Sequence, residues 1–417
     1  MKRHLIGIGG VGMSALATAL LRLGDEVTGA DRTLGTPNIR FLESLGVKVY
    51  PDDGSGIDAA TDEVIVSTAI EETNAGLIKA KELGIPVTHR AKALSRTLKD
   101  YKLVAVVGTC GKSTVTAMLG HVLAECGLDP MCVNGANVPG WEGAVRFGKG
   151  EYAVAEVDES DKSLVAFKPY AAIVTNASAD HYSKEEMDEV FDAFVKDCEG
   201  PVIDGRKGLE GLGSLEGLDV PIPGKHNLQN AQHAVLMVIA LGVEPERAIA
   251  AMKTFRGVER RLQLITSQTF QTSKPPKPAV YDDYAHNPEK LKAMWTTLAE
   301  KYSAGICVIW RPHGYAPLRK MMDALARMFA ETVRPQDKLL LLPVYDAGGT
   351  ADRSVNSDEL LEKVKARGEG EQRCVLIPDL EAAYDWCAAH KGDYAAFVTC
   401  GARDPGLPAL AKRLSEM

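Results

Sequence analysis

The feature that most constrains this chain is a short glycine-rich segment between a buried-strand pattern and a helical pattern. The apolar run 103–107 is typical of a strand, and apolar residues recur at helical spacing over 115–123. The segment between them is Gly108-Thr109-Cys110-Gly111-Lys112-Ser113-Thr114. In this context backbone N–H groups and a helix N-terminus face a polyphosphate, Lys112 neutralises it, and the hydroxyl of Ser113 or Thr114 reaches Mg²⁺. The segment predicts an ATP-binding loop; the alternative is an ordinary turn rich in small residues.

Short apolar runs alternate with helical patterns along the whole chain. The runs expected to form strands are 5–9, 27–31, 64–67, 86–89, 103–108, 152–157, 171–176, 280–282, 305–310, 338–344, 374–377 and 395–400. This alternation implies parallel sheets covered by helices, and 417 residues are too many for one ordinary core. We predict an α/β protein of three domains: a Rossmann-like domain at 1–97, a central P-loop domain at 98–256, and a second Rossmann-like domain at 257–417.

Composition limits the classes of partner. The net charge is −8 with no block of Lys or Arg, which argues against nucleic acid and anionic membranes as partners. No stretch approaches the ~18 apolar residues of a membrane span. The eight cysteines are scattered, which favours reduced thiols. We therefore expect a cytoplasmic protein, a monomer or homodimer, with small-molecule substrates.

A second glycine run lies near the start of the chain. Gly7, Gly9 and Gly12 form a G-x-G-x-x-G pattern between a strand and a helix, and Asp31 ends the next predicted strand. This pattern is a dinucleotide fingerprint, so an NAD(P)-dependent oxidoreductase is one alternative. The ATP-binding loop at Gly108 begins too soon for a full six-stranded dinucleotide domain to precede it. A non-catalytic nucleotide-binding protein is a further alternative.

Further motifs follow the ATP-binding loop in a fixed order. They are Ala155-Glu156-Val157-Asp158-Glu159, Asn176 with Asp180-His181, Gly224-Lys225-His226-Asn227 with Asn230, Arg260-Arg261, and Asp282-Asp283-Tyr284-Ala285-His286. With the short G-T-x-G-K-S-T loop, this series resembles the Mur ligase family over nearly the whole chain. The resemblance implies a ligase that uses ATP and Mg²⁺ to activate a carboxylate as an acyl phosphate and joins it to an amine.

The resemblance also implies roles for individual residues. The catalytic set would be Lys112, Glu156, His181, Arg261 and Asp283, with Ser113, Glu156 and His181 at the metal and Glu159 as a weaker candidate. ATP would contact Gly108, Thr109, Gly111, Lys112, Ser113, Thr114, His226, Asn227, Asn230, Arg261 and Asp283. Because Asp283 belongs to the last domain, domain closure would complete the site.

The stretch from His4 to Ser14 resembles one branch of the family, whose members join L-alanine to UDP-N-acetylmuramate in peptidoglycan precursor synthesis. That resemblance assigns the diphosphate to Gly9, Gly10, Val11 and Gly12 and places Asp31 near the uridine. The same branch includes a recycling ligase that attaches an intact tripeptide, which stays an alternative.

The chain departs from this branch in three places. In Pro312-His313-Gly314-Tyr315-Ala316-Pro317-Leu318-Arg319, Gly314 and Pro317 replace basic residues expected to hold the amino-acid carboxylate, which leaves Arg319 as a substitute. The amine site would comprise Tyr284, His286, His313 and Arg319. Cys110 stands where the alanine-adding enzymes have histidine. Only 44 residues separate His181 from His226, so we expect a shortened central domain.

Overall fold

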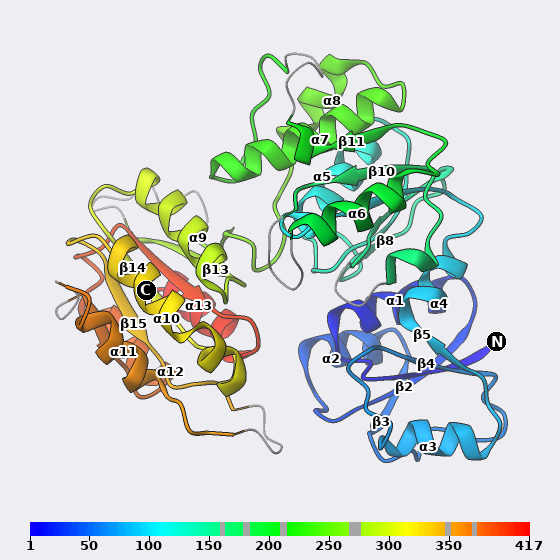
Figure 1. The fold of residues 1–417 in the computed structure, drawn as a ribbon, viewed down its shortest axis with the longest axis horizontal. Coiled ribbons are helices and arrows are strands. Elements are labelled where there is room, and N and C mark those ends of the chain that lie inside the picture. The colour runs from blue at the N-terminus through cyan, green and yellow to red at the C-terminus, as the bar shows by residue number, and fades with distance from the viewer. Residues whose placement is uncertain (159–162, 178–183, 209–214, 267–276, 347–351, 369–372) are drawn as a thin grey trace. The chain divides into compact units, whose positions relative to one another are not determined.

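The computed structural model describes residues 1–158, 163–177, 184–208, 215–266, 277–346, 352–368 and 373–417. The chain is an α/β protein with three sheets (Figure 1), which confirms the predicted fold class. It divides into two compact units, Met1–Pro221 with His226–Val258, and Ile222–Lys225 with Glu259–Met417. Within the described ranges, no helix combines the length and apolar character that a membrane crossing requires.

The first sheet has five parallel strands in the order β3-β2-β1-β4-β5. Its elements are β1 (Lys2–Ile6), α1 (Val11–Arg22), β2 (Glu26–Asp31), α2 (Pro37–Ser44), β3 (Lys48–Pro51), β4 (Glu63–Val66), α3 (Ala75–Glu82), β5 (Val87–His89) and α4 (Arg90–Thr97). Neighbouring residues point to opposite faces, so Leu5 packs in the core cluster with residues of α1 and α4, whereas Ile6 packs with residues of α3. Both faces are therefore buried, as parallel sheets require.

β1 lies earlier in the chain than predicted, because three polar residues begin it. His4 is fully buried and its Nδ1 shares a 2.9 Å hydrogen bond with Thr28 Oγ1. Arg3 forms a 3.1 Å ion pair with Asp25. These partners let a polar segment enter the sheet, and the predicted strand 5–9 was wrong at both ends.

The second sheet, in the same unit, has six strands in the order β11-β10-β6-β9-β7-β8. Its elements are β6 (Lys102–Val107), α5 (Lys112–Glu125), β7 (Met131–Val133), β8 (Val145–Arg146), β9 (Tyr152–Glu156), the 3₁₀ turn Ser163–Ala166, β10 (Ala171–Val174), α6 (Lys184–Val195), β11 (Val202–Asp204), the 3₁₀ turn Gly205–Lys207, α7 (Lys225–Ala240) and α8 (Pro245–Met252). The strands are parallel except β8, which is antiparallel to β7. β6 lies between β10 and β9, so the loop that follows it adjoins the ends of both neighbours.

The third sheet forms the second unit, in the order β12-β13-β17-β14-β15-β16. Its elements are β12 (Gln263–Leu264), β13 (Ala279–Asp283), α9 (Pro288–Lys301), β14 (Ile306–Trp310), α10 (Tyr315–Thr332), β15 (Lys338–Leu341), α11 (Ser357–Lys365), β16 (Cys374–Leu376), α12 (Leu380–Ala389), β17 (Ala396–Cys400) and α13 (Gly406–Ser415). Only β12 pairs in the antiparallel sense. The last strand, β17, lies between β13 and β14, so the loops after these three strands meet at one edge of the sheet.

The predicted domain boundary at 97/98 falls at the end of α4, and the one at 256/257 falls just before Val258, where the first compact unit ends. The exact boundaries stay predictions.

Candidate active site

The ATP-binding loop is held by the end of the neighbouring strand β10. The Cys110 N–H donates to Asn176 Oδ1 at 2.9 Å, and Asn176 Nδ2 donates to the Cys110 carbonyl at 3.0 Å. Thr175 Oγ1 donates to the same carbonyl at 2.7 Å, and the Thr109 N–H donates to the Asn176 carbonyl at 3.2 Å. A single amide side chain thus binds both sides of the loop residue Cys110 and fixes the shape of the loop.

Two glycines of this loop are required by the backbone and by space. Gly108 has φ +129°, and a Cβ there would lie 2.2 Å from Thr175 Oγ1. Gly111 has φ +87°, and a Cβ there would lie 2.7 Å from Asn230 Oδ1. L-residues rarely adopt these angles, so any other residue would displace the loop. The second contact also shows that α7 lies against the loop.

The start of α5 suits a polyphosphate. The helix begins after Gly111 without a side-chain cap, so the positive end of its dipole is not neutralised by its own N-cap. Lys112 Nζ folds back to donate to the Gly108 carbonyl at 2.6 Å, and Ser113 and Thr114 are buried in the first turn. A loop with glycine at positions 108 and 111, an ammonium and an uncapped helix N-terminus together fit an anionic triphosphate.

Glu156 ends β9, at the same edge of the sheet as the loop. Its Oε2 accepts a 2.7 Å hydrogen bond from the Gly135 N–H. The other predicted metal ligand outside the loop, His181, lies outside the described residues, as do Asp180 and Glu159. In the part of the chain that the structure describes, no group of three His, Cys, Asp or Glu side chains is placed to hold a metal ion. The Mg²⁺ site of Ser113, Glu156 and His181 stays a prediction.

The first turns of α7 carry the predicted adenine-side residues. His226 is exposed, whereas Asn227 and Asn230 are buried, and Asn230 Nδ2 lies 3.4 Å from Asn227 Oδ1. Asn230 is also the residue that approaches Gly111. The structure therefore brings Asn227 and Asn230 to the ATP-binding loop.

The N-terminal glycine loop is organised by Asp31. Asp31 Oδ2 accepts from the Gly9 N–H at 2.9 Å, and its Oδ1 accepts from the Thr33 N–H at 3.0 Å. Asn38 Nδ2 donates to the Gly9 carbonyl at 2.9 Å. After Gly10, α1 begins without a side-chain cap, so its N-terminus can also receive an anion. Asp31 shapes this loop, and its predicted position near a uridine stays a prediction.

One basic residue at this loop was not predicted. A Cβ on Gly12 would lie 2.9 Å from Arg90 Nη1, so the Arg90 guanidinium lies at the first turn of α1. Arg90 begins α4, directly after the edge strand β5. This contact could not be predicted from the sequence, because it depends on how α4 packs beside α1.

In the second unit, Asp283 is buried at the end of β13. Its Oδ1 accepts from the Ala285 N–H at 2.7 Å, and its Oδ2 accepts from the Leu262 N–H at 2.6 Å. Burial raises the pKa of this carboxyl to about 6, and the two backbone hydrogen bonds and the nearby Arg261 only partly oppose that shift.

The two consecutive arginines have different surroundings. Arg260 Nε donates to Asp282 Oδ2 at 3.0 Å, and its guanidinium also donates to the carbonyls of Gly401 and Ala402. Arg261 stacks on the ring of Tyr284, with 5.3 Å between the guanidinium carbon and the ring centre. Among the described residues it makes no hydrogen bond or ion pair. Arg260 therefore ties the linker to the sheet, whereas the predicted contact of Arg261 with ATP stays a prediction.

Three of the four predicted amine-site residues lie together. The ring centres of Tyr284 and His286 are 5.5 Å apart, and those of His286 and His313 are 4.8 Å apart. Burial lowers the pKa of each histidine to about 4, and the cation Lys290 adds to both shifts. Both rings are therefore uncharged near neutral pH.

The fourth predicted residue, Arg319, has other partners. Its Nη2 lies 2.7 Å from Asp352 Oδ2 and 2.9 Å from Ser354 Oγ. Its predicted role as a carboxylate ligand stays a prediction, in competition with this ion pair.

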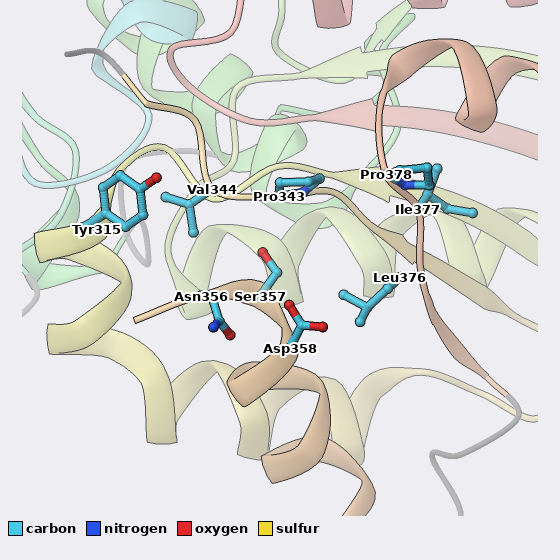
Figure 2. A pocket seen from close by; sticks show the side chains of 9 residues that line it. All are labelled: Tyr315, Pro343, Val344, Asn356, Ser357, Asp358, Leu376, Ile377 and Pro378. Carbon is cyan, nitrogen blue, oxygen red and sulfur yellow. The ribbon is translucent and has the colours of Figure 1, made fainter. Parts of the chain in front are cut away.

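A hollow of about 350 Å³ lies beside the amine-site loops, at the ends of β15 and β16 (Figure 2). It is lined by Tyr315, Pro343, Val344, Asn356, Ser357, Asp358, Leu376, Ile377 and Pro378. The lining is mainly apolar, and its one ionisable acid is Asp358. It contains no cation, so it does not suit a carboxylate.

Comparisons with known proteins agree with this geometry. Residues 2–102 match the model described as Mur ligase family, catalytic domain, and residues 260–403 match the one described as Mur ligase, glutamate ligase domain. The chain is 30% identical to a UDP-N-acetylmuramate–L-alanine ligase of Sinorhizobium fredii, over 99% of this chain and 97% of that protein. It is also 30% identical to the ligase of that name from Desulforamulus reducens, over 97% of this chain and 95% of that protein.

The crystal structure of UDP-N-acetylmuramate-alanine ligase MurC from Thermotoga maritima shares the fold, with a TM-score of 0.81 and 24% identity over 100% of this chain and 98% of that one. A murein peptide ligase from Psychrobacter arcticus shares it at a TM-score of 0.66 and 20% identity, over 100% of this chain and 99% of that one.

The two relatives named from Sinorhizobium fredii and Desulforamulus reducens are ligases, enzymes that form C–N bonds. The chain belongs to the Mur ligase family, as the resemblance predicted. The alignment with the Sinorhizobium fredii ligase spans 468 positions, more than the 417 residues of this chain. That ligase therefore carries segments that have no counterpart here.

Proposed function

We propose that this protein joins L-alanine to the carboxylate of UDP-N-acetylmuramate, with conversion of ATP to ADP and phosphate. The observation that carries the proposal is the 30% identity to a ligase of that name, in an alignment that covers 99% of this chain. The geometry supports it, because the two glycine loops of the first unit each precede an uncapped helix and suit two different phosphorylated substrates.

An amine cannot displace an oxide ion from the carboxylate of the sugar nucleotide, so the carboxylate oxygen must first be converted into a better leaving group. A carboxylate oxygen attacks the γ-phosphorus, the bond to ADP breaks, and an acyl phosphate forms. The amine lone pair then attacks the carbonyl carbon, phosphate leaves, and the extra amine proton passes to solvent or a base. Such transfers depend on positioning and charge neutralisation rather than on a protein nucleophile.

The described residues account for most of these requirements. Lys112 and the N-terminus of α5 would neutralise the triphosphate, and Ser113 with Glu156 would hold Mg²⁺, which stabilises charge on the transferred phosphoryl group. Arg261 and Asp283 would contact ATP from the second unit. In the first unit, Arg90 would add a positive charge beside Gly12 for the diphosphate of the sugar nucleotide.

The test is phosphate release from Mg-ATP with UDP-N-acetylmuramate and each of L-alanine, L-serine, glycine and L-Ala-γ-D-Glu-meso-diaminopimelate. We expect release that needs both the sugar nucleotide and L-alanine. Lys112→Ala should abolish it, whereas Lys99→Ala, which changes an exposed lysine, should not. Release that needs the sugar nucleotide and occurs with the tripeptide but with none of the amino acids would establish the recycling ligase instead. No release with any of the four amines would refute both ligase functions.

A further inference from the structure

Position 314 lacks the basic side chain that the family resemblance leads one to expect, yet a guanidinium lies beside it. Gly314 has φ +155°, and a Cβ built on it would meet Pro317 Cδ at 3.6 Å and Arg403 Nη1 at 4.0 Å. The positive charge of Arg403 therefore lies close to where a longer side chain at position 314 would begin.

Arg403 reaches this place from a different part of the chain. It belongs to the loop after β17, and β17 lies between β13 and β14. Its loop therefore enters the edge of the sheet between the loop that carries His286 and the loop that carries His313. The topology alone places Arg403 among the predicted amine-site residues.

The backbone beside Arg403 is well fixed. Asp404 is buried; its Oδ2 accepts from Arg311 Nη1 at 2.5 Å, and its Oδ1 accepts from the Gly406 N–H at 2.8 Å. The bond to Arg311 ties the loop after β17 to the end of β14. Arg403 is thus presented by an anchored loop rather than by a free one.

The charge of Arg403 is not neutralised within the protein. Its side chain is exposed, and in the described part of the chain it makes no hydrogen bond or ion pair. Its positive charge instead opposes protonation of His313, as that of Arg261 opposes protonation of His286. Uncompensated cations beside neutral imidazoles attract an anion. By contrast, the guanidinium of Arg319 is already paired with Asp352.

We propose that Arg403 binds the α-carboxylate of the amino-acid acceptor, in place of a basic residue at position 314. The inference rests on the proposed ligase function and names the residue that selects its acceptor. A guanidinium binds a carboxylate through two parallel hydrogen bonds, so it favours an acceptor with a free carboxylate next to its amine. The neutral rings of His286 and His313 would border the same site.

The experiment compares L-alanine with L-alaninamide in Arg403→Gln, Arg319→Gln and Arg413→Gln. The last variant is the matched control, because Arg413 lies on α13, the helix that follows the same loop, and forms an exposed pair with Glu381 of α12. We expect Arg403→Gln to raise the KM for L-alanine by about 10- to 100-fold. Its kcat/KM for L-alaninamide and its KM for ATP should match those of Arg413→Gln. If the amide is not a substrate, its inhibition constant replaces its KM.

Each other outcome overturns the inference. A KM for L-alanine in Arg403→Gln equal to that of the control would do so, as would an equal loss for the acid and the amide. A loss confined to the acid in Arg319→Gln, but absent in Arg403→Gln, would assign the carboxylate to Arg319. If the wild type ligates L-alanine and Arg403→Gln has the same KM for it, only this inference is rejected. If the wild type shows no ligation, both the proposed function and the inference are rejected.

Discussion

Removal of the Asn176 side chain tests how the ATP-binding loop is held. Asn176→Ala deletes an acceptor for the Cys110 N–H and a donor to the Cys110 carbonyl. That carbonyl keeps Thr175 Oγ1 as a partner, so the loss falls mainly on the N–H. Two net hydrogen bonds are worth about 2 kcal/mol, with a range of about 1–3 kcal/mol.

This energy should appear in nucleotide binding, because the same loop is the proposed site of the phosphates. Each 1.4 kcal/mol is about tenfold in affinity, so we expect the dissociation constant of ADP or a non-hydrolysable ATP analogue to rise about 5- to 150-fold. Asn176→Asp should be worse than Asn176→Ala. It keeps the acceptor but presents a carboxylate to the Cys110 carbonyl and adds a negative charge near the phosphates.

Asn38→Ala is the matched control, since Asn38 also donates an amide hydrogen bond to a glycine loop, at the Gly9 carbonyl. Titration calorimetry with the nucleotide and with UDP-N-acetylmuramate should separate the two variants. Asn176→Ala should weaken only the binding of the nucleotide, and Asn38→Ala should weaken only the binding of UDP-N-acetylmuramate. Normal nucleotide affinity in Asn176→Ala would refute the conclusion that this side chain shapes the loop.

Three other predictions follow from single sites. Gly108→Ala should abolish ATP turnover, because its methyl group would lie 2.2 Å from Thr175 Oγ1; turnover within about threefold of the wild type would contradict the required backbone. Arg90→Gln should raise the KM for UDP-N-acetylmuramate about tenfold and leave that for ATP unchanged, as measured by initial rates; an equal rise in both would argue against a local contact. The raised pKa of Asp283, about 6 against 3.8, means that the folded state holds the proton more tightly, so stability is lost as the pH rises through that interval. Between about pH 4.5 and about pH 7.5 the loss is about 2 kcal/mol, and denaturant melts of Asp283→Asn should lack this component of the pH dependence.

The sheets could be predicted from the sequence where strands are long and buried on both faces. Val104 to Val107 of β6 are fully buried, and their apolar run marks the strand plainly. β3, β7, β8, β11 and β12 were missed, and each has only two to four residues, too few for a periodic pattern. The predicted strand 338–344 ends early, at Leu341, because Pro343 has no N–H to donate.

The two glycine loops could be recognised in the sequence because phosphate binding, their proposed function, constrains consecutive residues. Gly108, Gly111 and Lys112 are close in sequence and act together in space. Asn176 was noticed only as part of a motif, and its hydrogen bonds to Cys110 depend on β10 lying beside β6. Arg90 had no signal at all, since its contact with Gly12 depends on helix packing.

The amine site shows why a motif can look incomplete when the fold is not. Gly314 suggests that a positive charge has been lost, because sequence comparison looks for it in the same loop. In this sheet the last strand, β17, lies between β13 and β14. The loop after β17 therefore adjoins the loops after β13 and β14, although both lie much earlier in the chain. Arg403 can therefore supply a charge beside Gly314 without any change in the neighbouring motif. Because an acceptor carboxylate needs the positive charge only at one point in space, any of these adjoining loops that reaches that point can supply it.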